Sequence, residues 1–225
     1  LPAFEAAGVS MLLTATIQEA CELRLLGWAR PILVLGSELS LYGPSERREI
    51  AEWLVRHDVR VTLTREEDIP ALAAAARLAQ QPARVHLKFD TGMSRMGVAE
   101  AAGLGLVARL AGDPLVQLEG VYTHFATADE YDKTFANEQL ERFRRLLAEL
   151  RTRRIAVPLI HAANSAALID LPESHFDLVR PGIAVYGYQP SSEMHHQPDL
   201  RPAMKLVSRL TLVKRLPAGS AVGYG

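Results

Sequence analysis

Residues 84–98 run RVHLKFDTGMSRMGV, and this stretch decides how the rest of the chain is interpreted. It begins as a short apolar run between a proline and a glycine, which predicts a buried strand, and it turns polar where that strand ends. In α/β proteins the loops at the carboxyl ends of parallel strands carry the ligand sites. Lys88 on the strand and Arg95 in the loop are therefore candidate site residues. The alternative is a strand end without a ligand, capped by Asp90 and held by a salt bridge.

On both sides of this stretch, predicted strands alternate with predicted helices. Strands are predicted at residues 9–13, 31–36, 59–64, 84–89, 116–125, 158–161 and 176–179, and helices at 17–23, 44–54, 69–78, 103–111, 134–154 and 165–169. Strict alternation of about seven such units predicts an α/β fold with parallel strands. A doubly wound sheet stays open as an alternative. Polar motifs recur at the ends of nearly all the strands, and this favours a (β/α)₈ barrel.

From about residue 189 the pattern changes. Residues 190–198 form a polar linker, residues 204–214 alternate as a strand does, and residues 221–225 begin another strand. We therefore divide the chain into a barrel domain, residues 1–189, and a linker with the beginning of a C-terminal β-domain, residues 190–225.

The composition is that of an ordinary globular protein. The chain has 225 residues, of which 48% are hydrophobic and 23% charged, and its formal net charge is -1. This charge offers no basic surface for nucleic acid or for an anionic membrane, and no apolar run reaches the ~20 residues that cross a bilayer. The single cysteine, Cys21, predicts a reducing, cytoplasmic setting. Because the first residue is Leu1 and not Met, we expect a fragment.

Three further strand ends carry residues suited to chemistry. His124 ends the stretch GVYTH, although a packed histidine with a satisfied hydrogen bond is the more common case. Asn164 and Ser165 follow the next strand and suit a phosphate, or they simply cap a helix. Arg180 ends the last predicted strand before a proline and a glycine, where it suits an anion or lies in solvent at a turn.

Two sharper interpretations are set aside. Asp90-Thr91-Gly92 is also the tripeptide of aspartic proteases, but those proteins are all-β, and here the tripeptide lies between predicted helices. His195 and His196 lack a third ligand at metal spacing, so we assign them to the linker and predict no metal site.

Taken together, the stretches LKFDTGMSRMG, GVYTHFATADE, HAANSAA, RPGIAVYG and AVGYG resemble alanine racemase, a family of enzymes that use pyridoxal 5'-phosphate (PLP). They span nearly the whole chain in the family's order, and the combination is highly specific. The resemblance implies a PLP-binding (β/α)₈ barrel followed by a C-terminal β-domain. It also implies a cytoplasmic homodimer that supplies D-alanine for peptidoglycan and whose sites take residues from both subunits.

The resemblance assigns the cofactor ring to three residues. Arg180 would face the pyridine nitrogen, and because an arginine side chain only donates hydrogen bonds, that nitrogen should stay unprotonated. His124 would lie against the ring, held by Asn164.

The same resemblance also indicates which residues would bind the cofactor phosphate and the substrate. Ser165 and the backbone amides of Gly182 and Ile183 would bind the phosphate. Arg95 would reach the phenolic oxygen of the cofactor and the substrate carboxylate, and Lys88 would brace Arg95.

Tyr224 matches the tyrosine that works as one of the family's two acid/base groups. The lysine that binds the cofactor covalently belongs to a VKANAYGHG-like motif, which this sequence lacks, so we expect it before Leu1 and expect a barrel without its first strand. The activity implied is PLP-dependent interconversion of L-alanine and D-alanine. Two alternatives stay open: a racemase of serine or of several amino acids, and a PLP-binding barrel protein without catalysis.

Overall fold

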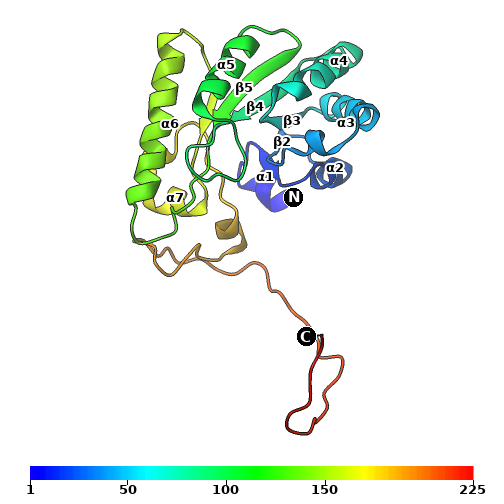
Figure 1. Ribbon diagram of the computed structural model, residues 1–225, viewed down its shortest axis with the longest axis vertical. Helices are drawn as coiled ribbons and strands as arrows, with labels where there is room; N and C mark the ends of the chain where they lie inside the picture. The colour runs from blue at the N-terminus through cyan, green and yellow to red at the C-terminus, as the bar shows by residue number, and fades with distance from the viewer. Residues whose placement is uncertain (225) are drawn as a thin grey trace.

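The computed structural model describes residues 1–224, and Figure 1 shows one sheet surrounded by helices, with a long tail at the C-terminal end. The strands are β1 (Leu12–Thr14), β2 (Ile32–Val34), β3 (Val59–Leu63), β4 (Ala83–Lys88), β5 (Val116–Tyr122) and β6 (Leu159–His161). The α-helices are α1 (Pro2–Ala6), α2 (Ile17–Leu25), α3 (Pro44–Arg56), α4 (Ile69–Ala79), α5 (Glu100–Leu110), α6 (Thr134–Thr152) and α7 (Ser165–Asp170). Short 3₁₀ helices are η1 (Glu38–Leu41), η2 (Glu66–Asp68), η3 (Pro172–Ser174) and η4 (Ile183–Tyr186).

The six strands form one parallel sheet in the order of the chain, β1-β2-β3-β4-β5-β6. Each strand pairs with the next in parallel, and helices α2 to α6 follow the first five strands in turn. This arrangement confirms the predicted α/β fold, and it is that of a partial (β/α)₈ barrel whose strands carry the helices on their outer face.

The two faces of the central strands differ sharply. On β4, Val85 and Leu87 belong to the hydrophobic core beneath the helices. Successive side chains of a strand point to opposite faces, so Arg84, His86 and Lys88 lie on the inner face. The inside of this half-barrel is therefore polar around β4, whereas the interior of such barrels is usually filled by bulky apolar residues.

A β-bulge in β5 changes the phase of that alternation. Val85 pairs with Leu118 but His86 pairs with Gly120, so Glu119 is the extra residue of the bulge. Glu119 and Tyr122 are three positions apart and would face opposite sides of a regular strand. The bulge lets both face inward. Gly120 also gives the ring of His86 its room, because a Cβ on Gly120 would lie 2.5 Å from its Nδ1.

The helices form where the sequence predicts them. The capping box at the start of α2 is present, since Thr16 Oγ1 accepts the N–H of Glu19 at 3.2 Å and the Glu19 carboxylate accepts the N–H of Thr16 at 3.1 Å. Helix α6 buries its apolar side, which includes Phe143 and Leu147. No helix within residues 1–224 is long and apolar enough to cross a membrane.

Asp170, at the end of α7, ties the segment after the barrel domain to the rest of the protein. Its buried carboxylate pairs with Lys133 Nζ at 2.9 Å. It also accepts the backbone N–H groups of His195 at 2.9 Å and His196 at 3.0 Å. Burial acts to raise the pKa of Asp170, but the hydrogen bonds from Lys133, His195 and His196 outweigh it and lower this pKa to about 2.

The predicted strands near the C-terminal end do not form. Residues 176–179 make only one isolated bridge, Leu178 to His161. Residues 204–214 are irregular and exposed, and residues 221–224 are irregular too, while Gly225 lies outside the described residues. A strand is stable only beside a partner that takes up its backbone hydrogen bonds, and residues 1–224 hold no partner strand for residues 204–214 and 221–224. The division of the chain at residue 189 stays a prediction.

Candidate functional site

Lys88, His124 and Arg180 come together at the carboxyl ends of the strands. Lys88 ends β4 and His124 follows β5, and Arg180 reaches them from the segment after α7. The Arg180 Nη2 atom lies 3.3 Å from Nδ1 of His124. Lys88 Nζ lies 5.7 Å, and Arg180 Cζ 5.1 Å, from the ring centroid of Tyr122. We call Lys88, His124 and Arg180 the cationic cluster.

Arg95 lies at the rim of the cationic cluster, in the loop that follows β4. The Asp90 carboxylate accepts the N–H groups of Gly92 and Ser94, each at 3.0 Å, and the Asp90 N–H donates to the carbonyl of Val98 at 2.9 Å. These bonds form the cap at Asp90 that belonged to the alternative interpretation, and they close the loop on itself. No ion pair to Asp90 is found within residues 1–224. The side chain of Arg95 is exposed at the tip of this loop.

Arg180 is a buried cation without a carboxylate partner within residues 1–224. Only 8% of the residue is exposed. Its Nη1 donates to Nδ1 of His161 at 2.7 Å, and its Nη2 donates to the carbonyls of Thr123 at 2.8 Å and Ala162 at 3.0 Å. Within residues 1–224 no acceptor is found for its Nε–H, which is thus available to a ligand. Burial lowers the pKa of Arg180 to about 10, so the side chain stays charged at neutral pH.

Burial and neighbouring positive charges lower the pKa values of Lys88 and His124. Burial, then the charges of Arg95 and Arg180, lower the pKa of Lys88 to about 8, and Asp90 acts weakly in the opposite direction. Burial, then Arg180 and Lys88, lower the pKa of His124 to about 3, so its imidazole is neutral. Such a site suits an anionic ligand. Within residues 1–224 no group of three His, Cys, Asp or Glu side chains is arranged to hold a metal ion.

Tyr122 forms the floor of the cationic cluster, and the sequence analysis did not single it out. Its hydroxyl lies 2.8 Å from Oγ1 of Thr62, and its ring stacks on His161 with centroids 4.6 Å apart and planes at 8°. Burial raises the pKa of Tyr122 to about 12, so this phenol is neutral at all physiological pH values.

Gln139, on α6, was also missed, and it joins the loops after β4 and β5. The side chain is fully buried. Its Nε2 donates to the carbonyl of His124 at 3.2 Å and to Oγ1 of Thr91 at 3.4 Å, and its Oε1 accepts the N–H of Ala126 at 2.9 Å. A polar residue on the apolar side of a predicted amphipathic helix is the signal that could have revealed it.

Ser165 and Gly182 adjoin the cationic cluster on the side of α7. Ser165 Oγ accepts the N–H groups of Gly182 at 2.8 Å and Ala184 at 3.3 Å. A Cβ on Gly182 would meet no atom within 4 Å, so the turn is open on that side. Ile183 begins η4, and its N–H therefore has no acceptor within that helix.

Asn164 has a structural role that the sequence analysis gave as the alternative. Its Oδ1 accepts the N–H of Ala167 at 3.0 Å and so caps α7. The resemblance assigns Asn164 to His124, whereas in residues 1–224 the ring of His124 lies against Arg180.

Tyr224 is not brought to the cationic cluster. Its side chain is fully exposed, at 108% of the reference area. Figure 1 shows that the tail, orange to red, leaves the barrel domain and ends far from the sheet.

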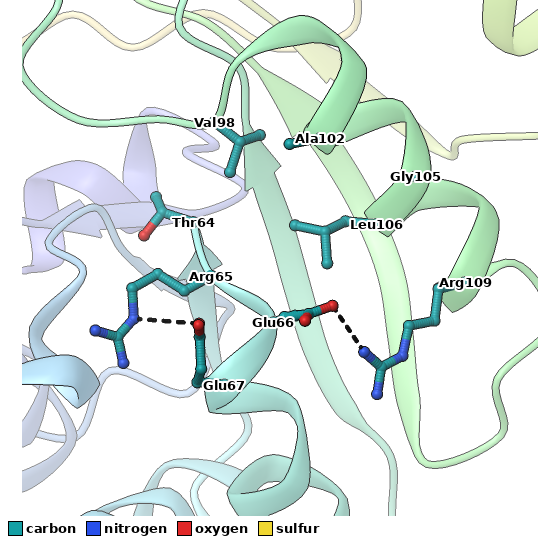
Figure 2. Close-up of a pocket in the computed structure, with 9 residues that line it drawn as sticks. All are labelled: Thr64, Arg65, Glu66, Glu67, Val98, Ala102, Gly105, Leu106 and Arg109. Atoms are coloured by element: carbon teal, nitrogen blue, oxygen red, sulfur yellow. Dashed lines mark hydrogen bonds and ion pairs between the residues drawn. The ribbon is translucent and has the colours of Figure 1, made fainter.

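A groove of about 670 Å³ lies outside the barrel, between the loop after β3 and helix α5. Figure 2 shows its charged side chains paired with one another: Glu66 with Arg109 at 3.0 Å and Arg65 with Glu67 at 3.9 Å. Exposed pairs of this kind contribute at most about 1 kcal/mol and leave no unsatisfied charge for a ligand. None of the predicted site residues lines this groove.

Comparison with known proteins gives one consistent result. The family model "Alanine racemase, N-terminal domain" matches residues 1–190. The alanine racemase of Syntrophobacter fumaroxidans is 43% identical over 221 residues, covering 98% of this chain and 56% of that protein. That of Desulfovibrio desulfuricans is 40% identical over 220 residues, covering 98% of this chain and 57% of that protein.

The comparison with solved structures gives the same family as the two sequence comparisons. The alanine racemase of Clostridium difficile 630 in complex with cycloserine superposes with a TM-score of 0.81 at 32% identity, covering 89% of this chain and 53% of that one. The chain thus spans about half the length of the relatives that it matches. With the family model matching most of its length, the chain belongs to the alanine racemase family.

Proposed function

We propose that the protein carrying this chain is an alanine racemase that interconverts L-alanine and D-alanine with PLP. The observation that carries the proposal is the buried Arg180 guanidinium, which among the described residues has no carboxylate partner and keeps one N–H free beside His124 and Lys88. The names of the relatives support the reaction. Two relatives support the substrate class: the Clostridium difficile structure holds cycloserine, and the alanine racemase from Bacillus anthracis holds L-Ala-P.

The residues present fit PLP. The cofactor offers a pyridine nitrogen as acceptor, which the free Nε–H of Arg180 suits, and because Arg180 cannot accept a proton at that position, the nitrogen would stay unprotonated. His124, neutral at the rim, would lie against the ring. The phosphate would be held by the hydroxyl of Ser165 and the backbone N–H of Ile183, where the turn leaves open space, and by the N–H of Gly182 in exchange for its hydrogen bond to Ser165 Oγ. When bound, PLP supplies an electron sink for the bonds at Cα of an amino acid.

The substrate end is assigned to the other cations and to Tyr224. Arg95, exposed at its loop tip, would bind the alanine carboxylate and the phenolic oxygen of the cofactor. Lys88 would contribute positive charge behind Arg95, since the two lie close enough for their charges to interact. Tyr224 would take or return the proton at Cα of alanine. With a reference pKa of ~10, a phenol needs a neighbouring cation to act as a base at neutral pH.

We further propose a cytoplasmic homodimer that supplies D-alanine for peptidoglycan. Tyr224 lies in a tail that leaves the barrel domain, so it would reach a cationic cluster most directly in a second copy of the chain.

The test is a racemisation assay on the whole protein supplied with PLP. L-alanine should lose its optical activity, and Arg180→Leu should abolish both the reaction and most of the PLP binding. Arg109→Leu, which removes an exposed arginine of the outer groove, is the matched control and should change neither. PLP binding without any racemisation would favour the non-catalytic alternative, and equal rates with serine would favour a broader racemase.

Tyr224→Phe completes the test. It should abolish exchange of the Cα hydrogen of L-alanine for deuterium while leaving some exchange from D-alanine. Full activity in this variant would remove Tyr224 from the mechanism.

A further inference from the structure

A chain of hydrogen bonds leads from Arg180 away from the cationic cluster into the barrel interior. Arg180 Nη1 lies 2.7 Å from His161 Nδ1, and His161 Nε2 lies 2.8 Å from His86 Nδ1. His86 Nε2 lies 3.0 Å from Oε2 of Glu119. Both histidines are fully buried. The chain thus ends on a carboxylate three hydrogen bonds from Arg180.

Every proton in this chain has only one possible place. A guanidinium can only donate, so Nδ1 of His161 must accept and carries no hydrogen. A neutral imidazole holds one hydrogen, which must then lie on Nε2 of His161 and point at Nδ1 of His86. His86 therefore carries its own hydrogen on Nε2 and donates it to Glu119. These positions are assigned from the network of hydrogen bonds. All three bonds run in one direction, from Arg180 to Glu119.

Glu119 is held at the far end by further charges. Arg60 donates to it twice, from Nε to Oε2 at 2.9 Å and from Nη2 to Oε1 at 3.2 Å, and Arg84 Nε lies 3.6 Å from Oε1. Two arginines keep this carboxylate ionised and fixed, so it can only accept. It faces the interior because it is the extra residue of the bulge in β5, beside the space that Gly120 leaves for the ring of His86.

We propose that Glu119 is a positioning residue for Arg180, acting through His86 and His161. The carboxylate accepts the Nε2–H of His86 and so holds that ring, His86 accepts from His161, and His161 holds Nη1 of Arg180 so that the Nε–H remains free. In naming the pyridine nitrogen as the acceptor of that Nε–H, the inference rests on the proposed function. The tautomers do not depend on it.

The test measures tautomers directly, by long-range ¹H–¹⁵N correlation spectra of the whole protein labelled at histidine, with and without PLP. In the wild type, His86 and His161 should each appear as a single tautomer protonated at Nε2. Arg180 still requires an acceptor at Nδ1 of His161, so Glu119→Leu should keep both tautomers but leave the Nε2–H of His86 without an acceptor, and the resonance of that proton should move upfield. Glu119→Gln keeps an acceptor oxygen and should return the resonance to its downfield position. Glu66→Leu, in the outer groove, is the matched control and should leave both spectra unchanged.

Kinetics supply the second measurement. Glu119→Leu should lower kcat by up to ~10²-fold, as small misplacements of catalytic groups do. It should leave KM for L-alanine little changed, because the alanine carboxylate is assigned to Arg95. Glu119→Gln should recover most of that loss.

Each outcome decides one question. A hydrogen on Nδ1 of either histidine in the wild type overturns the inference, even if Glu119→Leu fails to fold. An unchanged Nε2–H proton resonance of His86 in folded Glu119→Leu overturns it as well. Correct tautomers in a protein that does not racemise alanine leave the inference standing and refute the proposed function. Racemisation in a protein with a hydrogen on Nδ1 of either histidine supports the proposed function and overturns the inference.

Discussion

Replacing Asp170 by Asn should destabilise the protein strongly and in a pH-dependent way. Asn keeps the size of the side chain and one acceptor oxygen, but it removes the charge that Lys133 faces at 2.9 Å. The amide NH₂ must also face one of the donors that now converge on the carboxylate, namely Lys133 and the N–H groups of His195 and His196. A buried cation without its partner is the main consequence.

The magnitude follows from the pKa. The carboxylate titrates at about 2 in the folded protein and at a reference value of about 3.8 when unfolded. At about 1.4 kcal/mol per unit of pKa, this difference corresponds to roughly 2 kcal/mol of stability at pH 7. Leaving Lys133 buried and unpaired adds to this, toward the ~3–5 kcal/mol seen when one partner of a buried pair is removed. We therefore expect a loss of about 2–5 kcal/mol.

The pH dependence has a definite sign. Because the folded pKa of Asp170 lies below the unfolded value, its stabilisation is complete above about pH 4 and is lost as the pH falls toward 2. Its contribution should fall to about half by pH 3. The difference between wild type and Asp170→Asn should shrink accordingly.

Urea unfolding at pH 7 and pH 3, followed by the fluorescence of Trp28 and Trp53, measures both quantities. Glu138→Gln is the matched control, since it breaks an exposed pair with Arg142 and should change stability by less than about 0.5 kcal/mol. A loss below about 1 kcal/mol for Asp170→Asn at pH 7, or a loss that stays constant to pH 3, would refute the reasoning.

Three further substitutions test the interior. Gln139→Met should destabilise by about 2–6 kcal/mol in urea unfolding, since it strands a partly buried carbonyl and a partly buried N–H, each worth ~1–3 kcal/mol; a loss under about 1 kcal/mol would show that water replaces the amide. Gly120→Ala should cost about 1–3 kcal/mol, because the new methyl would meet the ring of His86, and thermal unfolding measures it; an unchanged Tm would mean that the ring moves aside freely. Tyr122→Phe and Thr62→Val should show a coupling energy of about 1 kcal/mol in a double-mutant cycle, as expected for one buried hydrogen bond; additive losses would contradict that bond.

Local patterns were enough to predict most of the fold. The 3.6-residue period of α6 and the capping box of α2 are local signals, and both elements formed where expected. Polar motifs at strand ends pointed to Lys88, His124 and Arg180, and parallel strands place their carboxyl ends at the same edge; the roles of these residues stay predictions.

The failures have a common cause in long-range pairing. The segment 176–179 has strand-like residues, but it makes only one bridge, because pairing depends on the distant β6 and not on local composition. The exposed tail, including Tyr224, has the alternation of a strand and no strand beside it within residues 1–224.

The inner polar network was missed for a different reason. Residues 84–89 alternate between polar and apolar side chains. A prediction of one short apolar run does not use that alternation, so it does not show that His86 faces inward. A strict two-residue alternation predicts that Glu119 and Tyr122, three positions apart, face opposite sides of β5. The bulge places both on the same face, so the alternation could not show that Glu119 faces inward.

That bulge also makes β5 unusually intolerant of changes in length. Below Glu119 the strand keeps one phase, with Val116 and Leu118 toward the helices, and above it the phase is reversed, with Val121 toward them. Deleting a single residue here would restore a regular strand. Either the Glu119 side chain, with its ion pairs, or the Tyr122 side chain would then point outward into the apolar layer beneath the helices. Point substitutions in β5 can be accommodated one at a time, but the number of residues between Leu118 and Val121 is fixed by two separate parts of the protein at once.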